Sequence, residues 1–396
     1  MTKVLYVDAA ASAQKSESVI NAEMDFLRNG YANAGRGICA RANAVDKMVA
    51  DTRIAVARFI GADSPDQIIF TSGTTDGLNR IPRILDLSGS ICPESIVCVS
   101  DLDHHSARLP WEEYAYLGKC KLTVCPLDTN FDLDLGAVPR ADIFVITAMS
   151  NVLGVPQDVK KLVAAARAKN PNVIVVVDAA QYVAHEKINV LDWDPDFLCF
   201  SGHKIGADTG IGVMYIKDPA RWAVDKLGGG MVSIVGARGN APDVGANNIR
   251  PNHQSQALSE WTLANVPARW EAGTLPLTQI AGLRSAIQDQ EQGSGKEREL
   301  LDYLYSELSK IPRIKILSVP DSVILTFVVD GMHPLDFGAM MGARGVCLRV
   351  GNMCASWLHA RLGLAGTIRI SPGAWNTMDE MKELVGIVKE VVSRKP

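Results

Sequence analysis

The stretch Val173-Ile-Val-Val-Val-Asp178-Ala-Ala-Gln181 carries the strongest structural signal in this sequence. Its five branched apolar residues leave no polar face, which is typical of a parallel strand buried between layers of helices. Asp178 follows directly, and ligands of open α/β sheets bind just beyond the carboxyl ends of the strands. Because a buried carboxylate needs a cationic partner, Asp178 is a candidate ligand-binding residue. The alternative is an Asp that caps the following helix.

A lysine follows the next apolar strand, in Phe200-Ser201-Gly202-His203-Lys204. A lysine amine can form a Schiff base with a carbonyl compound such as pyridoxal phosphate (PLP), and a neighbouring glycine lets a ligand approach the backbone. Lysine suits this chemistry because its pKa shifts readily on burial. The protonated pyridine nitrogen of PLP would also supply the cation that Asp178 needs. An ordinary surface lysine is therefore the weaker alternative.

A third motif, Phe70-Thr71-Ser72-Gly73-Thr74-Thr75-Asp76-Gly77, leads from a predicted strand into a predicted helix. Hydroxyls and free N–H groups at a helix N-terminus bind phosphate, although Ser and Thr also cap helices that bind nothing. A competing pattern, Gly35-Arg-Gly37-Ile-Cys-Ala40, fits a dinucleotide fingerprint. It follows no apolar strand, which argues against a nucleotide-binding oxidoreductase.

The first part of the chain alternates helical periodicity with short apolar strands, as in an α/β domain. We predict a large, mostly parallel sheet with helices on both faces. Strands are expected at 67–71, 95–99, 121–125, 143–147, 173–177, 197–200 and 212–216, and a helix at 45–59.

The pattern changes near residue 275. Helices are expected at 278–290 and 296–310, strands at 314–318 and 323–329, and a last helix that opens with a Thr377/Glu380 capping box. We therefore predict a large PLP-binding α/β domain over 15–274 and a smaller α+β domain made of 1–14 and 275–396. Residues 228–273 follow no period and are expected to form a surface excursion or a subunit contact.

Composition narrows the class of protein. The 396 residues are 47% apolar and 21% charged with a formal charge of −4, which argues against nucleic-acid binding. The run 173–177 is too short to cross a bilayer, so no membrane association is expected. The N-terminus lacks a signal-peptide layout, which predicts a cytoplasmic protein with free thiols. None of the eight cysteines forms a C-x-x-C pair, and no metal site is expected.

With these motifs in hand, the chain resembles the class V, fold-type I PLP enzymes, and among them the group II cysteine desulfurase and selenocysteine lyase family. The matching stretches run in family order over nearly the whole chain. They are 8–15, 31–33, 36–37, 74–75, 104–105 with 110–111, 150–154, 178–181, 201–204 with 209–212, 271–274, 354–355, and 369 with 376–377.

The resemblance implies a role for each residue around the PLP ring. Lys204 would hold the cofactor covalently and act in catalysis. Asp178 would pair with the pyridine nitrogen, and Gln181 would lie near the ring hydroxyl. His104 would stack on the ring and move protons.

The resemblance also implies which residues bind the phosphate. Thr75, Ser201 and His203 would bind it directly, with Thr74 nearby. Thr274 would reach the phosphate of the partner subunit, which implies a homodimer.

For the substrate, the family pattern implies that Asn151 and Arg369 bind the carboxylate of L-cysteine or selenocysteine, with Asn151 also beside the cofactor and Arg349 bordering the pocket. Cys354 would be the catalytic thiol that takes the sulfur as a persulfide. The products would be L-alanine and sulfur passed to an acceptor protein, with iron–sulfur cluster assembly among the expected uses. Positive charge from Arg349 and Arg369 would favour the Cys354 thiolate.

Two groups of alternatives remain open. One is a sister enzyme that does not use Cys354: a selenocysteine lyase, another Cβ–S lyase, an epimerase or an aminotransferase. The other is a non-catalytic scaffold in a sulfur-assembly complex, which the Lys204 and Asp178 pair argues against. The chain also departs from the family around the thiol, with Met353 where relatives carry His and Ser356-Trp357 where a Pro is often found.

Overall fold

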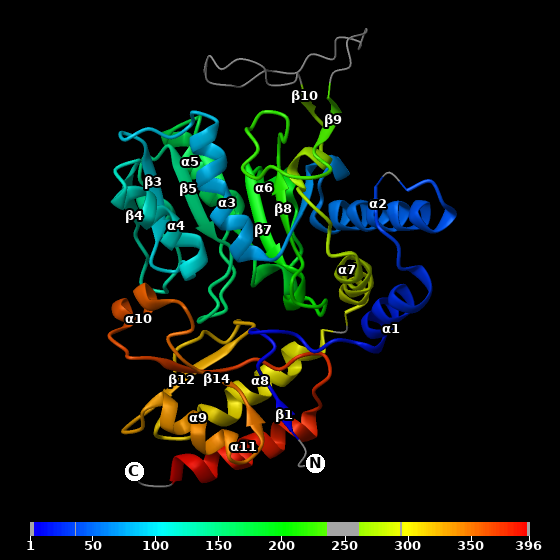
Figure 1. The fold of residues 1–396 in the computed structure, drawn as a ribbon. Helices are drawn as coiled ribbons and strands as arrows, with labels where there is room; N and C mark the ends of the chain where they lie inside the picture. The colour runs from blue at the N-terminus through cyan, green and yellow to red at the C-terminus, as the bar shows by residue number, and fades with distance from the viewer. Residues whose placement is uncertain (1–3, 36, 236–260, 294, 394–396) are drawn as a thin grey trace.

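The computed structural model describes residues 4–35, 37–235, 261–293 and 295–393. Figure 1 shows a large sheet with flanking helices above a smaller block, and the first and last labelled elements, β1 and α11, both lie in the smaller block. Residues 236–260, in the predicted surface excursion, and Arg36, in one of the matching stretches, lie outside the described residues. The ends of that excursion pair as an antiparallel ribbon of β9 (Val232–Val235) and β10 (Trp261–Leu263).

A seven-stranded sheet in the order β2-β8-β7-β6-β5-β3-β4 forms the centre of the larger block. Only β8 runs antiparallel to its neighbours in this sheet, so the predicted mostly parallel sheet is confirmed. The strands are β2 (Ile68–Thr71), β3 (Ile96–Ser100), β4 (Lys121–Cys125), β5 (Ile143–Thr147), β6 (Ile174–Asp178), β7 (Phe197–Ser201) and β8 (Gly212–Ile216).

The register of this sheet aligns the strand ends that carry the sequence motifs. Thr147 pairs with Asp178 between β5 and β6, and Asp178 pairs with Cys199 between β6 and β7. Ser201 at the end of β7 pairs with Gly212 of β8. Asp178 and the segment that leads to Lys204 therefore emerge at the same edge of the sheet.

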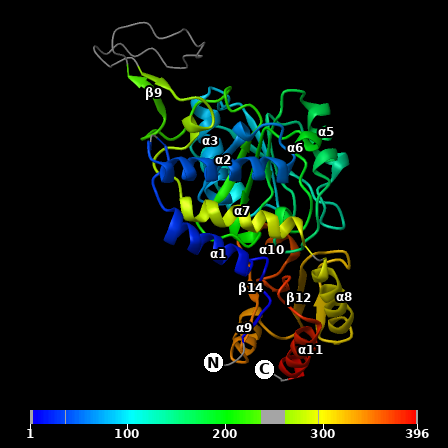
Figure 2. The same ribbon diagram turned by 90° about the vertical axis from the view of Figure 1, so that its right-hand side faces the viewer.

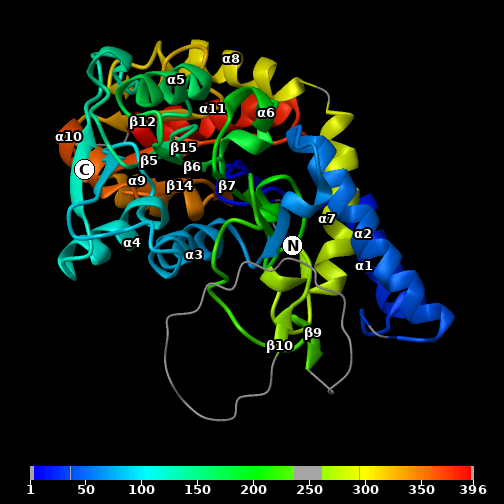
Figure 3. The same ribbon diagram turned by 90° about the horizontal axis from the view of Figure 1, so that it is seen from above.

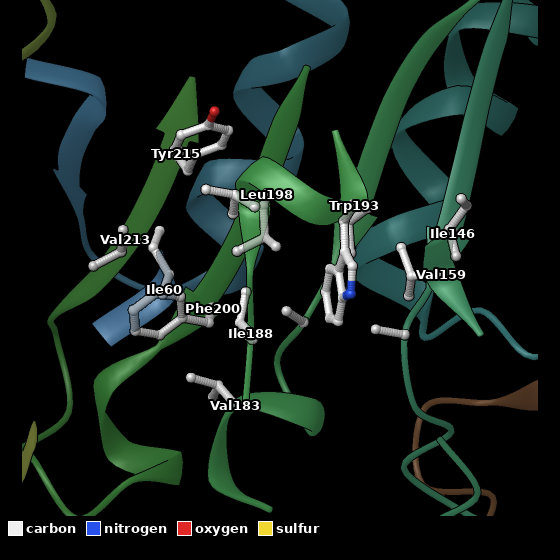
Figure 4. Packing of buried hydrophobic residues seen from close by; sticks show 14 of the residues in the cluster. Ile60, Ile146, Val159, Val183, Ile188, Trp193, Leu198, Phe200, Val213 and Tyr215 are labelled. Atoms are coloured by element: carbon white, nitrogen blue, oxygen red, sulfur yellow. The ribbon is translucent and has the colours of Figure 1, made fainter. Parts of the chain in front are cut away.

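Alternate residues of the central strands enter two separate cores, one on each face of the sheet. Leu198 and Phe200 of β7 pack with Val213 of β8 and Ile60 of α2 on one face (Figure 4). The residues between them, such as Cys199, pack against α3 and α4 on the other face. Burial on both faces explains why these strands carry almost no polar residues.

Helices cover both faces of the sheet, and Figure 2 and Figure 3 both show α1, α2 and α7 lying side by side along one flank. The helices of this block are α1 (Glu17–Asp25, continued by a π-helical turn at Phe26–Gly30), α2 (Ala40–Ile60), α3 (Thr74–Leu87), α4 (His105–Tyr116), α5 (Val159–Lys169), α6 (Val190–Trp193) and α7 (Leu277–Glu291). Short 3₁₀ turns lie at Pro65–Gln67, Leu135–Ala137, Tyr182–Ala184, Gly202–Lys204 and Ala268–Trp270.

The smaller block is built on an antiparallel sheet in the order β11-β12-β15-β14. Its strands are β11 (Ile314–Ile316), β12 (Leu325–Val329), β14 (Arg349–Gly351) and β15 (Thr367–Ile370), and its helices are α8 (Lys296–Leu308), α9 (Pro334–Gly342), α10 (Ser356–Leu362) and α11 (Met378–Ser393). The N-terminal β1 (Leu5–Tyr6) joins it by pairing with β13 (Val346–Cys347). The predicted capping box is confirmed, because Thr377 N donates to Glu380 Oε2 (3.1 Å) and Glu380 N donates to Thr377 Oγ1 (3.3 Å).

The division into domains at residues 14 and 274 stays a prediction. Leu277, Ile280 and Leu283 of α7 are buried in the core of the large sheet, whereas Leu300 and Leu304 of α8 are buried in the core of the smaller block. We therefore propose to place the second boundary between α7 and α8. No helix in the described ranges is both long and apolar enough to cross a membrane.

Candidate active site

The cofactor-binding residues predicted from the sequence gather around a cavity of about 190 Å³ at the carboxyl ends of β5, β6 and β7. The described residues that line it include every predicted cofactor-binding residue except Thr274: Thr74, Thr75, His104, Asn151, Asp178, Gln181, Ser201, His203 and Lys204. Ser106, Thr147, Met149 and Ala180 complete the lining. Segments far apart in the sequence thus meet at one edge of the sheet.

Asp178 ends β6 as a buried carboxyl group. Its Oδ1 accepts a hydrogen bond from Ala180 N (2.9 Å), which closes a local turn. Burial raises the pKa of Asp178 to about 6, and the nearby charge of Asp103 also raises it, while the charge of Lys204 lowers it. A positive group in the cavity would stabilise the ionised form of this acid.

Lys204 lies in the 3₁₀ turn that follows β7, with its side chain partly buried. Its Nζ donates a hydrogen bond to the carbonyl oxygen of Ala10 in the N-terminal segment. Burial lowers the pKa of Lys204 to about 7, and the charge of Arg369 lowers it further, against the opposing charges of Asp178 and Asp8. In a large share of the molecules the Lys204 amine is therefore neutral, and nucleophilic, near neutral pH.

One end of the cavity is rich in hydroxyl groups. Thr74 opens α3, and its backbone N donates to Ser201 Oγ (2.7 Å), while the two hydroxyl oxygens lie 2.7 Å apart. Gly73 precedes them with a φ of +151°, a conformation that favours glycine. His203 is neutral at pH 7, because burial and the charge of Lys204 lower its pKa to about 4. Donors at a helix N-terminus suit a phosphate group.

His104 caps α4 and lines the same cavity. Its Nδ1 accepts a hydrogen bond from Ser106 N (3.2 Å) and lies 2.8 Å from Ser106 Oγ. Burial and the charge of Lys204 lower the pKa of His104 to about 4, so the ring is neutral at pH 7. Since Nδ1 is the acceptor, the ring proton is assigned to Nε2.

Three buried polar atoms on residues that line the cavity have no hydrogen-bond partner among the described residues: Gln181 Oε1, Asn151 Oδ1 and His203 Nδ1. Burying a polar group without a partner costs about 1–3 kcal/mol. The lining therefore fits a polar ligand. With an acid, an amine and hydroxyls at a helix N-terminus, the same residues fit PLP in particular.

The two arginines predicted at the substrate pocket, Arg369 as a carboxylate ligand and Arg349 at its border, are cross-strand neighbours, with Arg349 on β14 opposite Arg369 on β15. Asp8 lies between them, with Oδ1 2.9 Å from Arg369 Nη2 and Oδ2 3.0 Å from Arg349 Nη2. Arg369 Nη1 also donates to Asn151 O (2.7 Å), whereas its buried Nε has no partner in the described ranges. Neither arginine is among the described residues that line the 190 Å³ cavity.

Cys354 is exposed and follows β14, outside the described lining of the cavity. Met353 and Cys354 both have left-handed backbone conformations, with φ of +50° and +55°. Asn151 links this segment to the cavity, because its Nδ2 donates to Met353 O (2.8 Å). The structure therefore places the candidate thiol on a segment that is hydrogen-bonded to a residue of the 190 Å³ cavity.

Thr274 is the one predicted cofactor-binding residue that does not line the 190 Å³ cavity. It is exposed and lines a different cavity of about 450 Å³, which also includes Arg53 and Glu271. These two residues form a buried ion pair with Nη2 and Oε2 2.7 Å apart. The role of Thr274 in a homodimer stays a prediction.

Two acidic residues near the site had no role in the sequence analysis. Asp8 belongs to a matching N-terminal stretch, but no pattern indicated that it would bridge two arginines. Asp103 is fully buried and accepts hydrogen bonds from Ser100 N (2.7 Å), Ser100 Oγ (2.8 Å) and Thr147 Oγ1 (2.7 Å). The one sequence signal that could have indicated a role for Asp103 was its place directly before His104.

Comparisons with known proteins agree with this geometry. The model of the aminotransferase class-V family matches residues 5–384. The chain is 31% identical to a cysteine desulfurase of Serratia proteamaculans (strain 568), over 98% of this chain and 93% of the relative. It is 32% identical to a cysteine desulfurase of Escherichia coli O127:H6, over 96% of this chain and 91% of the relative.

Solved structures give the same family. The apo cysteine desulfurase of Thermococcus onnurineus NA1 superposes with a TM-score of 0.87 at 27% identity, covering 98% of this chain and 94% of the other. The S-sulfonic acid form of the cysteine desulfurase CsdA from Escherichia coli superposes with a TM-score of 0.85 at 29% identity, with the same coverage of 98% and 94%. The likeness therefore extends over both blocks of the fold.

Proposed function

The chain belongs to the aminotransferase class-V family, whose cysteine desulfurases depend on PLP, and we propose that it is itself a PLP-dependent cysteine desulfurase. It converts L-cysteine to L-alanine, and Cys354 takes the sulfur. One observation supports this most strongly: Asp178 and Lys204 leave neighbouring strands and line one cavity. Asn151 ties that cavity to the segment that carries Cys354.

PLP, when bound, supplies an electron sink for the charge that develops at the substrate Cα. Asp178 would stabilise its protonated ring nitrogen, and Gln181 Oε1, now without a partner among the described residues, would accept a hydrogen bond near the ring hydroxyl. Thr74, Thr75, Ser201 and His203 would hold the phosphate end.

Lys204 is proposed as the base that takes the Cα proton of L-cysteine. An amine with a pKa of about 7 can both accept and release a proton near neutral pH, which is what acid–base catalysis requires. His104 is neutral in the same range and would cover the ring and carry protons at Nε2. The substrate carboxylate would bind Arg369, whose Nε has no partner among the described residues, with Arg349 at the border of the pocket.

In the sulfur-transfer step the Cys354 thiolate attacks the sulfur of the bound L-cysteine. A new S–S bond forms on Cys354 and the substrate Cβ–S bond breaks, with its electron pair retained on the substrate carbon skeleton. Protons delivered to Cβ and Cα then give L-alanine. Overall, L-cysteine and the Cys354 thiol yield L-alanine and a Cys354 persulfide, so atoms and electrons balance.

We further propose that the persulfide passes to an acceptor protein and that the enzyme is a homodimer in which Thr274 reaches the partner's phosphate. An exposed thiol such as Cys354 suits transfer to another protein. Because this thiol has to stay reduced between turnovers, we also propose a cytoplasmic location.

The reaction class can be tested with L-cysteine and dithiothreitol, by measuring alanine and sulfide together. Equal amounts of both are expected. Pyruvate and ammonia in their place would mean β-elimination and would contradict the proposal.

The second candidate is a selenocysteine lyase that does not use Cys354. The position of Cys354 outside the described lining of the cavity favours it. In Cys354→Ala, cysteine desulfuration should collapse under the leading proposal, while cofactor binding stays normal. Cys347→Ala, which removes another exposed thiol of the smaller block, is the matched control and should keep the parental rate. Undiminished desulfuration in Cys354→Ala would favour the second candidate.

A further inference from the structure

The thiol loop, defined here as residues 351–357, holds its cysteine in an unusual backbone conformation. Met353 and Cys354 are consecutive non-glycine residues with positive φ. Such residues are strained, and they persist only where the surrounding structure over-determines them, most often at functional sites. The groups that hold this conformation are therefore candidates for a role in the chemistry of Cys354.

Hydrogen bonds hold the backbone of the loop from inside and outside. Within the loop, Ala355 N donates to Asn352 O (2.9 Å) and Cys354 N donates to Asn352 Oδ1 (3.4 Å). From outside, Asn151 Nδ2 donates to Met353 O (2.8 Å), and His105 N donates to Cys354 O (2.8 Å). The last bond uses an N–H at the first turn of α4, which has no partner within its own helix.

The side chain of His105 contacts the two loop residues that follow Ala355, which are Ser356 and Trp357. Its Nε2 accepts a hydrogen bond from Ser356 N (3.3 Å) and lies 3.0 Å from Ser356 Oγ. The ring also packs edge-on against Trp357, with centroids 5.4 Å apart and an interplanar angle of 87°. His105 thus contacts Cys354 through its backbone and residues 356 and 357 through its ring, so one residue holds the cysteine and the segment that follows it.

A second residue of α4 supports the same contact. The Arg108 guanidinium lies over the Trp357 ring at 4.2 Å from its centroid, a cation–π arrangement. Two ion pairs hold Arg108 in place: its Nη1 lies 3.1 Å from Asp101 Oδ1, and its Nε lies 2.8 Å from Glu112 Oε1.

We propose that His105 is the positioning residue for Cys354: its backbone N–H and its ring fasten the thiol loop to α4 and keep Sγ in the orientation that attack on the substrate sulfur needs. The ring acts as a hydrogen-bond acceptor, which requires an unprotonated Nε2, and burial lowers the pKa of His105 accordingly. This inference rests on the proposed function, since it assigns His105 to the step in which Cys354 takes the sulfur.

The first test compares the holoenzyme with His105→Ala and His105→Gln. Persulfide on Cys354 is measured by mass spectrometry after a single turnover with L-cysteine, and the spectral change on adding L-cysteine reports the earlier steps in the cofactor cavity. His105→Ala should form persulfide about 10–100-fold more slowly, as expected when a reacting group is misplaced, with the spectral change intact. His105→Gln, whose Oε1 can still accept from Ser356 N, should recover most of the rate.

Two results would overturn the inference. One is a parental persulfide rate in His105→Ala. The other is an equal loss of the spectral change and of persulfide formation, which would mean that His105 supports the cofactor cavity instead of the thiol.

A second variant covers the case in which His105→Ala does not fold. Ser356→Pro removes the N–H and the hydroxyl that meet His105, and with the hydroxyl the acceptor for Asn352 Nδ2 (3.3 Å), at the first residue of α10, where proline is tolerated. It should show the same selective loss, and a parental rate there would count against the proposal.

Hydrogen–deuterium exchange over 351–357 separates this inference from the proposed function, because it needs no turnover. Exchange should be faster in His105→Ala than in the parental protein, and equal exchange would overturn the inference. If the parental enzyme formed no persulfide while exchange still differed, the proposed function would fall and the role of His105 in holding the loop would stand.

Discussion

The cofactor cavity and the thiol loop lie next to each other but are held in different ways. The cavity sits on strand ends whose positions follow from sheet register, as with Asp178 between Thr147 and Cys199. The thiol loop has two strained residues in succession and depends on hydrogen bonds from residues 151 and 105, about 200 and 250 positions away in sequence.

Because the two regions are held by different contacts, substitutions should be able to impair cofactor binding and the reaction of Cys354 separately. A change in the cavity should impair cofactor binding or the chemistry at the substrate Cα, because it alters the groups that we propose contact PLP. A change in the loop should leave PLP bound and slow only the transfer of sulfur. Four predictions follow from that contrast, in order of decreasing effect.

Lys204→Ala should have the largest effect. It removes the amine that we propose binds the cofactor and moves the Cα proton, so the visible absorbance of bound PLP and turnover should both be lost, the latter by at least about 10³-fold. Lys217→Ala, at an exposed lysine that follows β8, is the control and should behave like the parental protein. Parental turnover in Lys204→Ala would refute the mechanism.

Asp178→Asn should retain bound cofactor but lose about 10²–10³-fold in turnover, since it removes the charge that we propose stabilises the protonated ring nitrogen. Asp196→Asn is a matched control, because Asp196 also has its pKa raised by burial but lies at the opposite edge of the sheet, where it accepts from Val175 N (2.9 Å). A wild-type rate in Asp178→Asn would show that the electron-sink argument is wrong.

These first two positions also show what the sequence could predict. Short runs of strand-forming residues mark the strands of an α/β sheet locally, and the strands at 121–125, 143–147 and 212–216 were predicted with the bounds that the structure has. The predicted helix at 278–290 was also confirmed, as α7 (Leu277–Glu291).

The rest depends on contacts between distant segments, which periodicity does not encode. Nothing in the spacing of apolar residues says that α7 joins the core of the large sheet. Similarly, no local pattern predicts that Asp8 forms ion pairs with both Arg349 and Arg369. These arginines lie 341 and 361 positions after Asp8 in the sequence. Residues whose role is set by such long-range pairing could be recognised only by resemblance to a family.

The pH dependence of cofactor uptake by apoenzyme gives the third prediction. Only a neutral amine can attack PLP in the role that we propose for Lys204, and the Lys204 pKa of about 7 lies below the usual 10.5, so the neutral form predominates above pH 7. The uptake rate, followed by visible absorbance, should rise about tenfold per unit below that pH and level off above it.

Asp8→Asn sharpens this test, because the charge of Asp8 raises the Lys204 pKa. The midpoint of uptake should therefore move to lower pH in the variant. A rate that keeps rising through pH 9 in the parental protein would contradict the lowered pKa.

The smallest effect is expected far from both regions, at the start of α11. Thr377→Ala removes the hydroxyl that accepts from Glu380 N (3.3 Å), a cap worth about 1 kcal/mol in the free energy of unfolding. Ser393→Ala, at the last residue of the same helix, is the control. It should lower the free energy of unfolding by less, because that exposed hydroxyl donates to Glu390 O (2.8 Å).

Denaturant unfolding and steady-state kinetics together decide the outcome. Stability should fall in Thr377→Ala while turnover stays parental. A fall in turnover without a change in stability would mean that α11 is coupled to the arginines of β14 and β15, and that the cavity and the thiol loop do not account for the chemistry by themselves.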